Sequence, residues 1–312
     1  MTSDLDIVFI LGTGRCGSSL LQEVIARHPG CGFVSNVDDR LAALGLLGRA
    51  NSTVYGLVPP AMTRKGRLRF APSEGYRLLA REVSPLLTRP VRDLGRDDAT
   101  PWLDARLAAF FERRHRAQRP ARFVHKLTGW PRAGLLAEVF PRARFVHVVR
   151  AGRAVANSLL QMPWWQGHRG PQHWRLGPLR PEDHETWQAH GRSFVVLAGL
   201  YWKILVDAFQ DAEATVPGER WRTIRYEDLV AEPRATVAGL QDWIGLARSP
   251  AFERRLARQP FRAGRTQAYR RDLSAAQVRA LEQVLRAHLE RYGYLDGTDP
   301  VVGAAAGVRV GS

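Results

Sequence analysis

A short run of glycines and serines with one arginine, Gly12–Ser19, is the first part of the chain that could do chemistry. It lies between the apolar run Ile7–Leu11 and a segment with apolar residues at helical spacing, Ser18–Arg27. Glycines allow a tight turn that brings backbone N–H groups close to an anion, and the following helix N-terminus adds a favourable dipole. Arg15 adds a permanent positive charge, and two serines add hydroxyl donors. The pattern predicts an anion-binding loop.

A second pair of candidate residues follows another expected strand. Arg150 stands at the carboxyl end of the apolar stretch Arg144–Val149, which is where open α/β sheets bind ligands. Ser158 lies eight residues further on, in an expected helix, Ala151–Gln161. If the chain reverses directly after Arg150, both side chains can converge on one phosphate.

Other nucleotide-binding patterns fit the loop less well. It lacks the Gly-Lys-Ser/Thr ending of a Walker A loop, and no clear strand-end aspartate is available for Mg²⁺, which disfavours a P-loop kinase or NTPase. Gly12, Gly14 and Gly17 are not followed by an acidic ribose ligand about twenty residues on, as a dinucleotide site requires. A glycine turn that only packs a helix on a sheet is the remaining alternative.

Alternating strands and helices surround these motifs and predict right-handed crossovers and a parallel sheet. The expected strands are Ile7–Leu11, Arg122–Leu127, Arg144–Val149 and Trp221–Tyr226. The expected helices are Ser18–Arg27, Pro131–Phe140, Ala151–Gln161, Glu185–Ala212, Pro233–Ile244 and Ser274–Arg291. The fold class is therefore α/β, with a central parallel sheet flanked by helices.

Three segments stand outside this alternation. Residues 50–120 read as an insertion of helices and loops over a site, with weak helical patterns at Tyr76–Leu87 and Trp102–Arg114. Met162–Pro181 combines three tryptophans with glycines and prolines, and is either core or an aromatic wall of an acceptor pocket. We expect one domain over residues 1–295 and a loose tail at 296–312.

The composition is ordinary apart from its charge. The formal net charge is +16 and the sequence pI is near 11.0, and nearly all basic residues are arginines. A basic protein that binds nucleic acid or an anionic lipid is one interpretation, and a codon bias towards arginine is the other. The arginines are scattered, and no nucleic-acid-binding motif accompanies them, so we expect no nucleic-acid partner.

The compartment can also be inferred from the sequence. Cys16 and Cys31 have no disulfide-framework or metal-ligand spacing, and fit a reducing compartment. No apolar run reaches the roughly 18 residues that span a bilayer. Asp4 and Asp6 stand where a signal peptide would carry positive charge. We therefore expect a cytoplasmic protein that starts at or near Met1 and has no metal site.

Taken together, the two motifs resemble the PAPS-dependent sulfotransferase family, where PAPS is 3′-phosphoadenylyl sulfate. In that family a Lys/Arg-x-Gly-Thr/Ser-Thr/Ser loop binds the 5′-phosphosulfate, and an Arg and a Ser eight residues apart bind the 3′-phosphate. Here Arg15–Ser19 matches the loop, and Arg150 with Ser158 matches the pair. The resemblance implies a P-loop NTPase-like sulfotransferase fold, PAPS as the sulfuryl donor, PAP as the product, and no metal.

Further stretches agree with the bacterial and Golgi-type branches of the family. They are His28-Pro29, Arg225–Pro233, and Gly264-Arg265 followed by Tyr269–Ser274, so the resemblance covers about 5–48 and 121–294. The cofactor contacts that it implies are Gly14, Arg15, Cys16, Gly17, Ser18, Ser19, Arg150, Ser158, Tyr226, Gly264 and Arg265.

The reaction that the resemblance implies is in-line transfer of the sulfuryl group to a hydroxyl or amine of a carbohydrate, glycolipid or other small molecule. Arg15 and Lys126 are the candidates for charge stabilisation. The cytosolic branch places a histidine base two residues after the strand lysine, but here Thr128 occupies that position. Other branches use a carboxylate after the first helix, which points to Asp38 or Asp39. Their alternative role is that of N-cap and first-turn acid of an expected helix, Leu41–Leu47. The oligomeric state is open.

Overall fold

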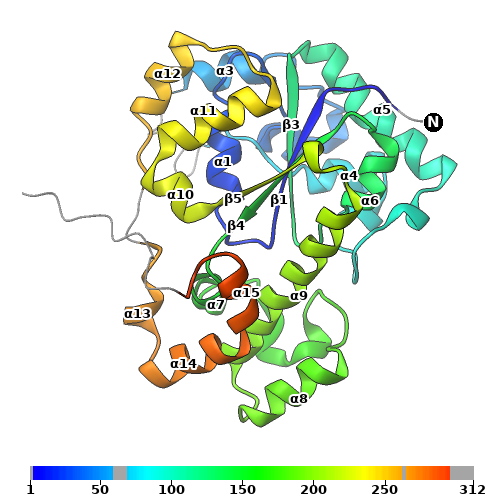
Figure 1. The fold of residues 1–312 in the computed structure, drawn as a ribbon. Coiled ribbons are helices and arrows are strands. Elements are labelled where there is room, and N and C mark those ends of the chain that lie inside the picture. The colour runs from blue at the N-terminus through cyan, green and yellow to red at the C-terminus, as the bar shows by residue number, and fades with distance from the viewer. Residues whose placement is uncertain (1–2, 59–68, 262–264, 296–312) are drawn as a thin grey trace, which may run out of the picture.

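The computed structural model describes residues 3–58, 69–261 and 265–295. Five parallel strands form its central sheet in the order β2-β3-β1-β4-β5 (Figure 1). The strands are β1 Ile7–Gly12, β2 Cys31–Gly32, β3 Arg122–Thr128, β4 Arg144–Val149 and β5 Trp221–Arg225. The expected parallel α/β sheet is confirmed. The sequence did not reveal β2, because two residues are too short for a periodic signal.

Alternation along the strands divides the core between two faces of the sheet. Residues such as Phe9 and Phe123 point to a face covered by α4 Tyr76–Glu82, α5 Pro101–Gln118 and α6 Ala133–Val139. Their neighbours, such as Ile10 and Val124, point to the face covered by α1, α11 and α12. The bounds of that second set are α1 Ser18–Ile25, α11 Pro233–Ile244 and α12 Pro250–Ala257.

A third layer lies beyond the carboxyl ends of the strands, in the lower half of Figure 1. Its buried side chains form one apolar cluster from α7, α8, α9, α14 and α15. The bounds are α7 Gly152–Leu160, α8 Pro181–Ala189, α9 Phe194–Thr215, α13 Tyr269–Asp272, α14 Ala275–Val284 and α15 Arg286–Arg291. The carboxyl ends of the strands therefore face a helical layer, and not open solvent alone.

Two expected long helices are interrupted. The expected helix Glu185–Ala212 is α8 and α9, because the chain turns at Gly191 and Arg192, where φ is 63° and 57°. The expected helix Ser274–Arg291 is α14 and α15, with Leu285 between them in a non-helical conformation. In both cases the apolar spacing continues across the break, so periodicity did not reveal it.

The expected insertion at 50–120 contains helices where it is described, and some of its side chains belong to the main core. It contains α3 Asn51–Leu57, α4 and α5. Phe110 and Phe111 of α5 are buried against the sheet. The Phe111 ring packs edge-on against that of Phe9, with 5.6 Å between the two ring centroids. The segment therefore supplies part of the main core, which corrects the expectation of a simple cap. Residues 59–68, and the expected tail at 296–312, lie outside the described residues.

Among the described residues, no helix combines the length and apolarity needed to cross a membrane.

Candidate functional site

The glycine loop has the backbone conformation of an anion-binding turn. Gly14, Arg15 and Gly17 have φ of 82°, 58° and 95°, a left-handed region that only glycine adopts freely. Positive φ beside helical residues turns successive N–H groups to the same side, as in phosphate-binding nests. A Cβ on Gly17 would lie 2.2 Å from the ring of Tyr226, so glycine is required there for a second reason.

The predicted residues of the second motif converge on this loop. Arg15 Nε donates to Ser158 Oγ in α7 at 2.8 Å. Arg150 donates to the carbonyl oxygens of Arg15 at 3.1 Å and Arg265 at 2.5 Å. The guanidinium of Arg150 also lies 4.7 Å from the centre of the Tyr226 ring. Five residues predicted from the sequence therefore lie together at the carboxyl end of β1 and β4.

The electrostatics of the cluster favour an anionic ligand. Burial lowers the pKa of Arg15, and the positive charges of Arg150 and Arg265 lower it further. Within the described ranges, none of these guanidinium groups forms an ion pair with a carboxylate. Arg150 Nε is buried without a hydrogen-bond partner in the described protein. Phosphate oxygens would satisfy this donor and relieve the repulsion.

Of the remaining loop residues, some are buried in the core and others face the site. The side chain of Cys16 is fully buried in the core between the sheet and α1, so only its backbone faces a ligand. Ser18 is buried at the start of α1, whereas Ser19 is exposed and accepts a hydrogen bond from Lys126 Nζ at 2.7 Å. Gly264 lies outside the described residues.

Lys126 and Thr128 share one face of β3, beside the loop, because side chains alternate along a strand. Lys126 Nζ forms an ion pair with Glu74 Oε1 at 3.0 Å, and Thr128 Oγ1 donates to the same oxygen at 2.8 Å. Glu74 did not stand out in the sequence. It lies in the segment before α4, and only tertiary contacts bring it to the loop.

The two aspartates expected near the site hold helix ends. Asp38 forms a capping box with Ser35 in α2 Asn36–Arg40, and its Oδ2 also accepts from Asn51 Nδ2 at 2.6 Å. Asp39 Oδ1 accepts the backbone N–H groups of Arg77 and Leu78, at the start of α4. Both carboxylates thus make capping contacts, but at α2 and α4 and not at the expected helix Leu41–Leu47, which contains only a 3₁₀ turn at Ala42–Leu44.

His125 lies on the opposite face of β3 from Lys126, because side chains alternate along a strand. It is fully buried, and its ring packs edge-on against Phe9 and Phe111. Burial lowers its pKa to about 3, so the ring is neutral at physiological pH. Neither ring nitrogen has a hydrogen-bond partner among the described residues. His125 is a core residue.

The tryptophan-rich segment is largely core. Trp165 and Trp174 are buried in the helical layer beside α9, whereas Trp164 is 42% exposed. The segment forms short 3₁₀ turns at Gln166–Arg169 and Pro171–His173. Of its three tryptophans, only Trp164 exposes its ring to solvent. Trp164 is therefore the only one of the three that could contribute to an aromatic wall of an acceptor pocket.

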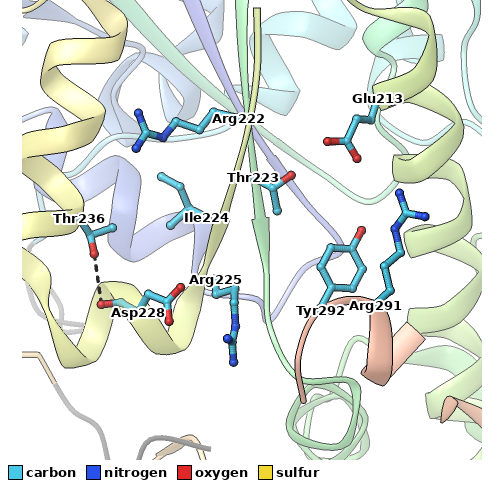
Figure 2. Close-up of a pocket in the computed structure, with 9 residues that line it drawn as sticks. All are labelled: Glu213, Arg222, Thr223, Ile224, Arg225, Asp228, Thr236, Arg291 and Tyr292. Carbon is cyan, nitrogen blue, oxygen red and sulfur yellow. Dashed lines mark hydrogen bonds between the residues drawn. The ribbon is translucent and has the colours of Figure 1, made fainter. Parts of the chain in front are cut away.

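A separate cavity of about 530 Å³ lies beside the edge strand β5 (Figure 2). The residues that line it are Glu213, Arg222, Thr223, Ile224, Arg225, Asp228, Thr236, Arg291 and Tyr292. Its three arginines are offset by two carboxylates, and none of the residues of the anion-binding cluster lines it. It is not the predicted site.

Comparison with known proteins identifies the family. The model of the sulfotransferase family matches residues 7–250. The fold is similar to that of sulfotransferase STF9 from Mycobacterium avium, with a TM-score of 0.54, 14% identity, and coverage of 93% of this chain and 77% of that chain. Sulfotransferase STF1 from Mycobacterium tuberculosis H37Rv gives 0.52 and 16%, with coverage of 92% and 78%. No curated protein sequence matches the chain. The expected P-loop-like sulfotransferase fold is confirmed, and the chain belongs to the sulfotransferase family.

Proposed function

We propose that this sulfotransferase takes the sulfuryl group from PAPS and passes it to a hydroxyl or amine of a small-molecule acceptor. The observation that carries the proposal is the convergence of Arg15, Arg150 and Ser158. These residues come from the loop, the end of β4 and the second turn of α7, and neither arginine forms an ion pair with a carboxylate of the described residues. PAPS carries two phosphate groups close to one ribose, and so needs such a set of cationic donors.

The residues divide into two groups by the part of PAPS that they would hold. Arg150 and Ser158 bind the 3′-phosphate, with Arg265 beside them. The N–H groups of the loop, together with Arg15 and Ser19, bind the 5′-phosphosulfate. When the S–O bond to the phosphate breaks, negative charge grows on that phosphate, and fixed positive groups stabilise it. Lys126 reaches the same place through Ser19.

The ligand that the protein binds distinguishes this proposal from a P-loop kinase or NTPase and from a nucleic-acid-binding protein. Calorimetric titration compares PAP with ATP–Mg²⁺ and with duplex DNA, on the protein purified without nucleotide. We expect sub-millimolar PAP binding that Arg150→Ala or Ser158→Ala weakens by about tenfold to a hundredfold, because each change removes a donor to a charged phosphate.

A matched control is Arg248→Ala. Arg248 pairs with Asp242 on the surface, so this change also removes one guanidinium but leaves the site intact. PAP affinity should stay unchanged in this variant. Tight ATP–Mg²⁺ binding without PAP binding would support a P-loop kinase or NTPase instead. DNA binding that falls steeply with salt, again without PAP binding, would support the nucleic-acid alternative.

A further inference from the structure

The proposed sulfuryl transfer, on which this inference rests, needs a group that takes the proton of the acceptor hydroxyl. Among the described residues, three carboxylates near the amino-terminal end of α4 are the candidates: Asp38 and Asp39 of α2, which packs against α4, and Glu74, which lies just before α4. The contacts and exposure of each decide between them, because a base must reach the acceptor and must have an oxygen free to accept its proton.

Asp38 is poorly placed for this role. Asp38 is only 5% exposed. Its Oδ2 accepts hydrogen bonds from the backbone N–H and the hydroxyl of Ser35, both at 2.8 Å, and from Asn51. Asn51 in turn donates to the carbonyl of Phe33. Asp38 therefore joins α2 and α3 to the chain after β2.

Asp39 is committed to the N-terminus of α4. Its Oδ1 accepts from Arg77 N at 2.9 Å and from Leu78 N at 3.1 Å, which fixes the start of the helix. The bridge between Ser35 and Pro72 holds the preceding chain against the same strand region. Glu74 lies between Pro72 and α4, so these contacts set its position.

Glu74 has the contacts that a base at this site needs. Its Oε1 is 3.0 Å from Lys126 Nζ and 2.8 Å from Thr128 Oγ1, and Lys126 Nζ is 2.7 Å from Ser19 Oγ in the loop. Its side chain is 25% exposed, against 8% for Lys126. Within residues 3–58, 69–261 and 265–295, Oε2 has no hydrogen-bond partner. One oxygen is held beside the loop, and the other is free.

A network around Thr128 fixes this arrangement. The Thr128 N–H donates to Tyr76 Oη at 3.1 Å, and Arg132 donates to the Thr128 carbonyl at 3.2 Å. Thr128 cannot act as a base itself, but its hydroxyl orients the carboxylate that reaches over it. The end of β3 thus presents a carboxylate where the cytosolic branch presents a histidine.

We propose that Glu74 is the general base, with Asp39 as a positioning residue for it. Glu74 Oε2 takes the proton of the acceptor hydroxyl as the acceptor oxygen forms its bond to sulfur. The bond between sulfur and the 5′-phosphate oxygen breaks, and its electron pair leaves on the phosphate of PAP. Lys126 lies between the base and the loop, because its Nζ contacts both Glu74 and Ser19.

The test compares Glu74→Gln with Asp38→Asn, each of which removes one charge and keeps the shape of the side chain. Release of labelled sulfur from PAPS is followed with water and with benzyl alcohol as acceptors, and PAP affinity is measured by calorimetry without acceptor. Glu74→Gln should lower kcat by about a hundredfold or more, with PAP affinity unchanged. Glu74→Asp should restore part of kcat. Asp38→Asn should lower thermal stability but keep kcat in the folded protein.

Glu82→Gln is the structural control, because Glu82 is a carboxylate at the far end of α4 that pairs with Arg114. It should change stability and not kcat. If Asp38→Asn abolishes turnover and Glu74→Gln does not, the assignment of Glu74 is wrong. Loss of PAP affinity in Glu74→Gln would make Glu74 a structural partner of Lys126. If the wild-type protein binds PAP but does not accelerate release of sulfur to either acceptor, the inference fails, whereas absence of PAP binding would overturn the proposed function itself.

Discussion

At the scale of single residues, two kinds of site residue differ in how far the sequence reveals them. Arg15, Arg150 and Ser158 belong to short motifs, because a loop, a strand end and a helix each place them locally. Glu74 belongs to no motif. It reaches Thr128 across 54 positions of the chain, and the bends around Pro72 and Gly75 that carry it there have no periodic signal.

The same contrast explains Asp38 and Asp39. The sequence led us to expect that the two aspartates could cap a helix at Leu41–Leu47, but the capping box that Asp38 forms with Ser35 belongs to α2, Asn36–Arg40. The sequence could not decide whether the carboxylates also face an acceptor, because that depends on where α3 and α4 pack. In the folded protein, Asn51 donates to Oδ2 of Asp38, and the start of α4 donates to Oδ1 of Asp39.

Gly17 allows a prediction at this scale. In Gly17→Ala the new methyl group would meet the Tyr226 ring at 2.2 Å, and the residue would be held at a φ of 95°. We expect a loss of about 1–3 kcal/mol in the free energy of unfolding from backbone strain, with a further loss from the clash. PAP affinity should fall by at least about tenfold, because the loop N–H groups shift.

The control for this change is Gly191→Ala, which imposes a φ of 63° on alanine but places no atom within 4 Å of the new methyl group. Denaturant unfolding and calorimetry with PAP measure both variants. Gly191→Ala should lose stability and keep PAP affinity. Equal behaviour of the two variants in both measurements would show that the contact with Tyr226 does not shape the loop.

At the scale of elements, the alternation of strands and helices was largely predictable because the central strands β1 and β4 are short and mostly apolar runs, each followed by residues at helical spacing. The sequence could not show how the helical layer beyond the strands assembles. The glycines and prolines around Trp165 and Trp174 are typical of a loop, yet both tryptophan side chains are buried against α9. Burial of that kind depends on which helices cover the carboxyl edge of the sheet, and this is a property of the packed molecule.

The packing of α7 against α9 gives a prediction at this scale. A Cβ on Gly152 would lie 2.6 Å from the Trp202 ring and 2.8 Å from Leu285, and Trp202 is fully buried and cannot move aside. Gly152→Ala should therefore cost about 1–3 kcal/mol in the free energy of unfolding. Because α7 carries Ser158, PAP affinity should fall as well, by several-fold to about tenfold.

Gly199→Ala provides the comparison for Gly152→Ala. Gly199 lies in α9, and a Cβ there would meet only the end of the Leu281 side chain, at 2.6 Å. This variant should lose less stability, since the end of a leucine side chain can shift more easily than the buried Trp202 ring, and alanine also favours the helix interior by about 1 kcal/mol. It should bind PAP normally. Unfolding curves and calorimetry test the pair. Unchanged PAP affinity in folded Gly152→Ala would mean that the position of α7 does not control the site.

At the scale of the whole molecule, the arginines behind the net charge of +16 have two roles: some form ion pairs that stabilise the fold, and others gather at the proposed anion site. Arg113 and Arg114 of α5 both pair with Glu82 of α4, and Arg153 of α7 pairs with Glu282 of α14. These arginines join neighbouring elements and are not a surface for a polyanion. The cluster of Arg15, Arg150 and Arg265 differs from them, because none of its arginines forms an ion pair with a carboxylate in the part of the chain that the structure describes.

That difference predicts how PAP affects the stability of the whole protein. The cluster draws residues from the loop after β1, the end of β4, and the chain before α13, so the proposed PAP site exists only in the folded state. At about 100 times its Kd, PAP should raise the free energy of unfolding by about 2.7 kcal/mol, and the midpoint of thermal unfolding by several degrees. Arg150→Ala should remove most of this shift at the same PAP concentration, and Arg248→Ala should keep it. Differential scanning calorimetry measures both, with inorganic phosphate at equal concentration as the reference anion. An equal shift with phosphate, or a shift that persists in Arg150→Ala, would mean that scattered surface arginines and not the cluster bind the anion.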